Sequence, residues 1–115
     1  MAAASTVRYE MQGKKATRFG FGEGLVVLGD RYENVVALGG DITGSVMTSY
    51  FKEKYPERFF SMGITEGAAT LVATGLALSG MIPFFATYGA FASCRNTDML
   101  RISCAYNDAN VKIGG

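Results

Sequence analysis

The residues best suited to chemistry in this chain surround a long segment without charge. Residues 67–94 contain no Asp, Glu, Lys or Arg, and Glu66 and Arg95 bound the segment. A carboxyl group at the start of an apolar helix can share a proton, because apolar surroundings favour its neutral form. Two aromatic residues of the same segment, Tyr88 and Phe91, are suited to enclosing a flat ring. The pattern predicts a carboxylate beside a ring-binding pocket.

Each of these residues also has an ordinary structural interpretation. A glutamate in the first turn of a helix is stabilised by the positive end of the helix dipole. Aromatic residues such as Tyr88 and Phe91 are more often ordinary residues of a core than walls of a binding pocket. When each residue is considered alone, its structural role is the favoured interpretation. A role in proton sharing or ring binding therefore needs support from the rest of the chain.

The composition excludes several kinds of site. The chain has 115 residues, with 11 basic and 10 acidic side chains, so it offers no concentrated basic face for nucleic acid. It has no histidine, which excludes Ser-His and Cys-His catalysis within the chain, and we expect it to hold no metal. We expect Cys94 and Cys104 to be buried free thiols, as in a reducing cytoplasm.

The uncharged segment is long enough to raise the question of a membrane span, which needs about 20 apolar residues. Threonines, glycines and Pro83 interrupt it, and its pattern changes from helical to strand-like halfway along. The N-terminus shows no basic region followed by an apolar core. We therefore predict a soluble cytoplasmic protein without contact to a membrane.

Helical and strand patterns alternate along the chain after a tail over residues 1–15. We predict helices at 17–30, with Thr17 as the N-terminal cap, and at 46–54, 65–79 and 89–106. We predict strands at 35–38, 58–61, 81–86 and 111–113. Strands joined by helices of this length form a mostly parallel sheet with helices on both faces. The fold class is therefore α/β, with residues 16–115 as its domain.

The helix at 65–79 has a well-defined apolar pattern and a clear end. Gly80 is suited to the left-handed conformation that ends a helix. We expect the face that repeats at helical spacing to pack on the sheet; it consists of Ile64, Ala68, Leu71, Val72 and Leu76.

Ligands of parallel sheets bind at the carboxyl ends of the strands. Three segments follow strand ends in this chain: the loop with Asp41 and Ser45, the turn that leads to Glu66, and the segment with Tyr88 and Phe91. We expect these segments to meet at one edge and to form one pocket.

Several motifs of the chain have the order and spacing of a known family. Together they resemble the pyrimidine-binding domain of transketolase, most closely the separate C-terminal subunit of split bacterial and archaeal transketolases. The resemblance to the beta chain of pyruvate dehydrogenase and to deoxyxylulose-phosphate synthase is weaker. The motifs are Ala16-Thr-Arg18-Phe-Gly-Phe-Gly-Glu-Gly-Leu25, Gly40-Asp41-Ile-Thr-Gly-Ser45, Pro56-Glu-Arg58-Phe-Phe60, Gly63-Ile-Thr-Glu66, Gly75-Leu-Ala-Leu-Ser-Gly80, Ile82-Pro-Phe84 and Asn110-Val-Lys-Ile113.

This resemblance implies thiamine diphosphate as cofactor. Glu66 matches the glutamate that bonds to a nitrogen of the cofactor's aminopyrimidine ring and favours the imino tautomer, which removes the thiazolium proton. Tyr88 and Phe91 match the aromatic wall around that ring, and Cys94 replaces a third aromatic residue found in some members. With the resemblance, catalysis becomes the favoured role of Glu66.

The resemblance also assigns the loop residues. Asp41 and Ile42 match a loop near the thiazolium, so we count them as cofactor-binding residues. Arg18 and Ser45 match positions that contact the phosphate of a sugar substrate, and the fork of arginine donors suits phosphate oxygens. The implied reaction is transfer of a two-carbon ketol unit between sugar phosphates.

Other parts of the family pattern are absent from this sequence. The Gly-Asp-Gly motif that holds the diphosphate through a metal is missing, so an N-terminal transketolase subunit is expected to supply it together with magnesium or calcium. We therefore expect an oligomer with a shared site. Family members continue beyond Ile113, which makes this an incomplete domain by resemblance.

Two alternatives stay open at this point. The usual residues after the glutamate are replaced by Gly67-Ala-Ala69, so the chain could be a non-catalytic assembly or regulatory fragment of the same fold. A related thiamine-diphosphate enzyme that uses alpha-keto acids or makes deoxyxylulose phosphate is the other alternative.

Overall fold

Four short strands form one parallel sheet in the computed structural model, which describes residues 13–115. Most of the tail predicted at 1–15 therefore lies outside the described residues. The strands are β1 (Val35–Gly39), β2 (Phe59–Ser61), β3 (Ile82–Ala86) and β4 (Lys112–Gly114), in the spatial order β2-β1-β3-β4. All three pairings are parallel, with Ala37 opposite both Phe59 and Phe84. The predicted parallel α/β sheet is confirmed.

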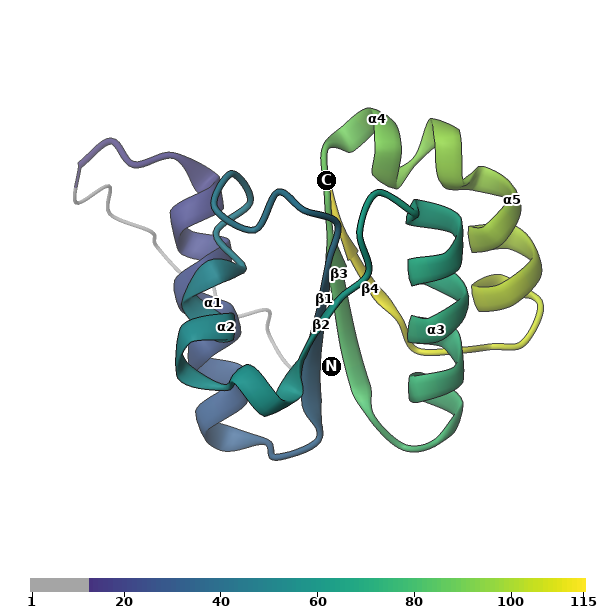
Figure 1. Cartoon of the computed structure of the whole chain (residues 1–115), viewed down its shortest axis with the longest axis horizontal. Helices are drawn as coiled ribbons and strands as arrows, with labels where there is room; N and C mark the ends of the chain where they lie inside the picture. The colour runs from purple at the N-terminus through teal and green to yellow at the C-terminus, as the bar shows by residue number, and fades with distance from the viewer. Residues whose placement is uncertain (1–12) are drawn as a thin grey trace, which may run out of the picture.

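Helices cover both faces of the sheet (Figure 1). α1 (Thr17–Arg31) and α2 (Ser49–Lys54) form one layer. α3 (Glu66–Leu78) forms the other layer, with a run of short helical segments beside it. This run comprises α4 (Gly89–Ala92), η2 (Cys94–Asn96), α5 (Thr97–Met99) and η3 (Leu100–Ala105), and a 3-10 turn, η1 (Pro56–Arg58), precedes β2.

Two apolar clusters hold these layers together, one on each face of the sheet. Successive side chains of a strand point to opposite faces, so β1 serves both clusters. The first cluster joins β1 and β2 to α1 and α2 and consists of Leu25, Val35, Ala37, Phe51 and Phe59. The second joins β1 and β3 to α3 and consists of Leu38, Ala69, Ala73 and Phe85. α1 and α2 pack closely: a Cβ added at Gly29 would lie 2.7 Å from the ring of Phe51.

The starts of the first two helices differ from the prediction. α1 begins at Thr17 itself, and its N-cap is Ala16, which has no side chain able to cap. α2 begins at Ser49, because Met47 has a φ of +61°, which a right-handed helix does not permit. Residues 43–48 form turns instead, so this part of the predicted 46–54 helix was wrong.

The orientation of α3 also differs from the prediction. Ala69 and Ala73 face the sheet in the second cluster. Thr70 and Thr74 are also buried, and their hydroxyls contact Asn96 and Cys104 of the short helical segments. Leu76 packs against the second cluster, but Ile64, Leu71 and Val72 of the predicted core face are exposed. Small side chains let the helix approach the strands closely. The predicted end of the helix is confirmed, because Gly80 has a φ of +94°.

The helix predicted at 89–106 is broken into the four short segments named above. Ser93 has φ −105° and ψ −78°, outside the usual helical range. Its hydroxyl donates to the Gly89 carbonyl oxygen at 2.7 Å, and the Thr97 hydroxyl donates to the Ser93 carbonyl oxygen at 2.8 Å. Such bonds from side chains to the backbone bend helices. The two cysteines consequently lie on separate segments, and Cys94 is an exposed free thiol, contrary to the expected burial.

A cluster of polar side chains joins α1 to the end of α2. Lys54 lies 2.7 Å from the Asp30 carboxylate, and the Tyr55 hydroxyl donates a hydrogen bond to the same oxygen. These hydrogen bonds, the one with Lys54 foremost, hold the pKa of Asp30 below its ordinary value. The bond to Asp30 likewise raises the pKa of Tyr55.

No helix within residues 13–115 combines the length and the apolar character required to cross a membrane.

Candidate functional site

The loops that follow β1, β2 and β3 meet at the carboxyl edge of the sheet. The amide of Met62, after β2, donates to the carbonyl oxygen of Gly39 at 2.8 Å. A Cβ added at Gly40 would lie 3.2 Å from the carbonyl oxygen of Gly63, so the two loops nearly touch. Thr87, after β3, donates its amide to the Gly114 carbonyl oxygen at 3.1 Å. The parallel sheet therefore brings together segments that are far apart in sequence, as predicted.

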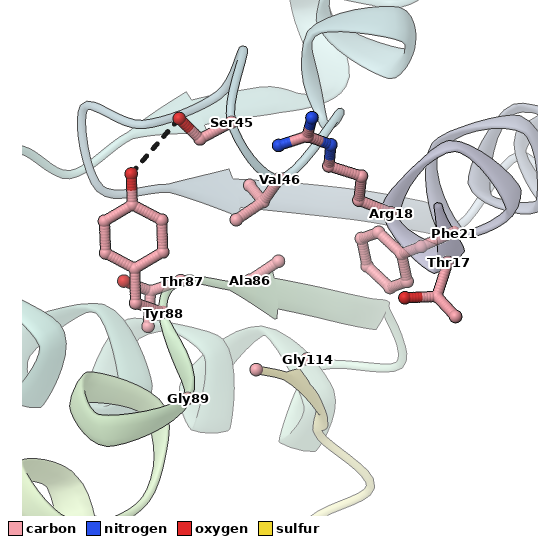
Figure 2. Close-up of a pocket in the computed structure, with 11 residues that line it drawn as sticks. Thr17, Arg18, Phe21, Ser45, Val46, Ala86, Thr87, Tyr88, Gly89 and Gly114 are labelled. Atoms are coloured by element: carbon pink, nitrogen blue, oxygen red, sulfur yellow. Dashed lines mark hydrogen bonds between the residues drawn. The ribbon is translucent and has the colours of Figure 1, made fainter. Parts of the chain in front are cut away.

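A pocket of about 430 Å³ opens at this edge (Figure 2). It brings together Arg18 from the first turn of α1, Ser45 from the loop after β1, and Tyr88 after β3. The Tyr88 hydroxyl donates to the Ser45 hydroxyl at 3.2 Å, which joins two walls of the pocket. The lining is completed by Thr17, Phe21, Val46, Ala86, Thr87, Gly89, Gly114 and Gly115. Arg18 is the charged side chain of this lining.

A second group lies beside this pocket and contains Glu66. Glu66 is the first residue of α3 and is 9% exposed. One of its carboxylate oxygens lies 3.6 Å from Nη1 of Arg95. The Arg95 guanidinium lies 4.1 Å from the centre of the Phe91 ring, and that ring lies 5.8 Å from the ring of Tyr88. Tyr88 therefore links the pocket to the pair formed by Glu66 and Arg95.

Buried hydrogen bonds fix the segment around Arg95 against α3. The side-chain amide of Asn96 donates to the Thr70 hydroxyl at 2.6 Å, and Thr70 donates to the Glu66 carbonyl oxygen at 2.9 Å. Asn96 is 1% exposed and Thr70 is fully buried. Breaking this chain of bonds would leave buried polar groups without partners. The bonds explain why Arg95 lies next to the first turn of α3 although the chain between them is long.

The loop after β1 contains two further candidate residues, Asp41 and Ile42. Asp41 is exposed, has a φ of +64°, and does not line the pocket. Aspartate is one of the side chains that tolerate this left-handed conformation. The carbonyl oxygen of Ile42 accepts the amides of Ser45 at 3.0 Å and Val46 at 3.2 Å. Ile42 thus shapes the turn that carries Ser45.

The candidate residues therefore fall into two neighbouring groups and a loop. Arg18, Ser45 and Tyr88 share the pocket, whereas Glu66 and Phe91 lie in the adjacent group around Arg95. The role of Arg95 was missed in the sequence, although it is the first charge after the long uncharged segment. Residues 13–115 contain no group of three or more side chains placed to hold a metal ion.

Comparison with known proteins identifies the family. Residues 13–114 match the family model described as "Transketolase, pyrimidine binding domain". A putative transketolase C-terminal section of Methanocaldococcus jannaschii is 43% identical over 99 residues, which are 86% of this chain. A 1-deoxy-D-xylulose-5-phosphate synthase of Dictyoglomus thermophilum is 42% identical over 71 residues, which are 62% of the chain. Human transketolase is 32% identical over 108 residues, which are 93% of the chain.

A solved structure of a transketolase is similar to this chain in fold. It is described as "Split gene transketolase, inactive beta4 tetramer" and matches 88% of this chain with a TM-score of 0.79 and 44% identity. The chain spans 34% of that structure, 31% of the Methanocaldococcus relative, 12% of the synthase and 17% of human transketolase. The match to the family model extends over nearly all residues of the chain. The chain therefore belongs to the family of transketolase pyrimidine-binding domains.

Proposed function

We propose that this chain supplies the pyrimidine side of a thiamine-diphosphate site in a transketolase-type transferase. The enzyme would move a two-carbon ketol unit from a ketose phosphate to an aldose phosphate. One observation carries the proposal: a nearly buried carboxylate, Glu66, opens α3 beside the aromatic pair Tyr88 and Phe91 at the carboxyl edge of the sheet.

The side chains of this group fit the ring of the cofactor. Tyr88 and Phe91 offer aromatic faces against which a flat heterocycle can stack. Glu66 approaches Arg95 only to 3.6 Å, which is too long for a good hydrogen bond, so its carboxylate can still bond to a ring nitrogen. Its low exposure excludes most of the water that would compete for that bond. When bound, thiamine diphosphate supplies a thiazolium carbon that loses a proton and attacks a carbonyl carbon.

The pocket next to this group suits the phosphate of a sugar substrate. Arg18 stands in the first turn of α1, where backbone amides and the helix dipole also attract anions. Ser45 and Tyr88 add hydroxyl groups to the same pocket. In this proposal Arg18 and Ser45 bind the phosphate, while Asp41 and Ile42 form the loop nearest the thiazolium.

A second subunit is part of the proposal. The relatives include a C-terminal section of a transketolase and a split-gene transketolase solved as a tetramer. These similarities support an assembly of several chains, in which an N-terminal transketolase subunit holds the diphosphate and its magnesium or calcium ion. Glu66 of this chain would then act in a site formed between subunits.

Reconstitution tests this function. The chain is combined with an N-terminal transketolase subunit, thiamine diphosphate and Mg²⁺, and transfer from a ketose phosphate is followed. Because a positioned acid or base typically contributes about 10²–10⁴-fold to a rate, Glu66→Gln should lower the rate by that order. The control is Glu53→Gln, which changes an exposed glutamate of α2. Equal rates for Glu66→Gln and the control would contradict the proposal.

A second candidate is a deoxyxylulose-phosphate synthase activity. It is favoured by the synthase relatives, one of which is 42% identical over 71 residues. The two candidates differ in the donor substrate, which would be an alpha-keto acid for the synthase. Turnover with pyruvate and a triose phosphate, but not with a ketose phosphate, would favour the synthase.

A further inference from the structure

Unfavourable conformations gather in the loop after β1, which we call the Ser45 loop (residues 41–48). Asp41 has a φ of +64° and Met47 a φ of +61°, and these are two of the three non-glycine residues with positive φ in the described part of the chain. Aspartate tolerates this conformation, whereas methionine rarely adopts it. Thr48 is fully buried, and its hydroxyl has no hydrogen-bond partner among the described residues. Such features cost stability and persist only where the surrounding structure holds them.

The surrounding structure holds the Ser45 loop against α1 at Gly22. A Cβ added at Gly22 would lie 2.5 Å from the carbonyl oxygen of Met47, 2.8 Å from its Cβ atom and 2.9 Å from the ring of Tyr50. These distances are too short for any side chain, so glycine is what lets the loop backbone lie directly on the helix. Gly20 and Gly24 of the same helix have open space around them instead. The close contact is therefore specific to Gly22.

This contact fixes the position of Ser45. Met47 follows Ser45 by two residues, and the Ile42 carbonyl oxygen accepts the Ser45 amide at 3.0 Å, which closes a tight turn just before the contact. The Ser45 side chain then meets the Tyr88 hydroxyl at 3.2 Å across the pocket (Figure 2). Gly22 and Met47 do not line the pocket themselves. They can therefore act on it through the position of the loop.

We propose that Gly22 and Met47 are positioning residues, which hold Ser45 in its phosphate-binding position before any substrate arrives. The inference rests on the phosphate role of Ser45 proposed above and adds how that residue is held. A group that is fixed beforehand loses less freedom on binding than a group on a free loop. Tighter binding thus offsets the unfavourable backbone at Met47. The substrate phosphate meets Arg18 and Ser45 in a pocket that is already formed.

Phosphate binding to the free chain tests the preformed pocket. Inorganic phosphate is added to the ¹⁵N-labelled chain, without cofactor or other subunits, and the amide resonances of Ser45 and Val46 are followed by NMR. Gly22→Ala pushes the loop away from α1, and Met47→Val places a β-branched residue at a positive φ, which such residues avoid. Each should weaken phosphate binding at least about 10-fold, the value of one hydrogen bond to a charged group. The matched controls, Gly24→Ala and Met47→Leu, should bind like the wild-type chain.

The reconstituted enzyme tests whether these residues act through Ser45. Fructose 6-phosphate and fructose are compared as donors, and the phosphate preference is the ratio of their kcat/KM values. Gly22→Ala should lower this preference at least about 10-fold through KM, while exchange of the thiazolium proton is unchanged. Ser45→Ala should lower it similarly. Adding Gly22→Ala to Ser45→Ala should cause little further loss, because both changes remove the same contact.

The outcomes separate this inference from the proposed function. Circular dichroism identifies the folded variants, and Met47→Val, which changes one half-buried side chain of a loop, keeps the comparison open if Gly22→Ala does not fold. The inference is overturned if the wild-type free chain does not bind phosphate, if a folded variant binds it like wild type, if a control weakens binding equally, or if the losses add up in the Ser45→Ala chain. Normal ketol transfer in any of these cases leaves the proposed function standing. Phosphate binding that responds as expected, in an enzyme without transfer, rejects the proposed function alone.

Discussion

Replacing Glu66 by glutamine separates a structural role of this carboxylate from a chemical one. The charge gains about 0.3–1 kcal/mol from the positive end of the α3 dipole. The ion pair with Arg95 adds about 0–1 kcal/mol, because the arginine side chain is 56% exposed and the atoms are 3.6 Å apart. Glutamine loses both but also avoids the cost of burying a charge. We therefore expect the free energy of unfolding to change by less than about 1 kcal/mol.

Urea unfolding of the wild-type chain and of Glu66→Gln measures this difference. Phe85→Ala is a reference for a structural residue, because Phe85 is fully buried in the cluster under α3 and should lose about 3–5 kcal/mol. Binding of thiamine diphosphate in the reconstituted enzyme is measured in parallel. A loss of more than about 2 kcal/mol for Glu66→Gln would refute the reasoning and identify Glu66 as a structural residue.

Three further predictions concern stability. Gly29→Ala should destabilise the chain by about 1–3 kcal/mol, because the added methyl group overpacks the contact with α2. Gly24→Ala, on the same helix, places its methyl group in open space and should stabilise the chain by about 0.5–1 kcal/mol. Urea unfolding measures both changes. Folding lowers the pKa of Asp30, so its ionised carboxylate stabilises the folded chain. This contribution to the free energy of unfolding is present above the unfolded pKa of about 4 and is lost as the pH falls through the folded pKa. The wild-type chain should therefore lose more stability than Asp30→Asn on acidification, and equal pH profiles would refute this. Arg95→Met should change the free energy of unfolding by less than about 1 kcal/mol, and a loss above about 2 kcal/mol would show that its pair with Glu66 is structural.

The sheet could be predicted because its strands have local signals. The run at Val35 is apolar on both faces, as a buried parallel strand requires, and Gly80 marks the end of α3. The orientation of α3 could not be predicted, because periodicity shows which residues share a face but not what covers that face. Leu71 and Leu78 share a face that the isolated chain leaves exposed.

For the candidate site, the meeting of the loops could be predicted from the sequence, whereas the position of Arg95 could not. Parallel strand order places the loops with Ser45, Glu66 and Tyr88 at one edge, and this follows from the alternation of strands and helices. The position of Arg95 depends on the break at Ser93 and on the buried bonds of Asn96. Those bonds form between segments far apart in sequence, so no local pattern of the chain indicates them.

The central claim is that Glu66 activates the cofactor. The most direct measurement follows exchange of the thiazolium C2 proton of thiamine diphosphate for deuterium by NMR in the reconstituted enzyme. With Glu66→Gln the exchange should slow by at least about 10²-fold, the lower range for a positioned acid or base, while the cofactor stays bound. An unchanged exchange rate at full occupancy would contradict the claim.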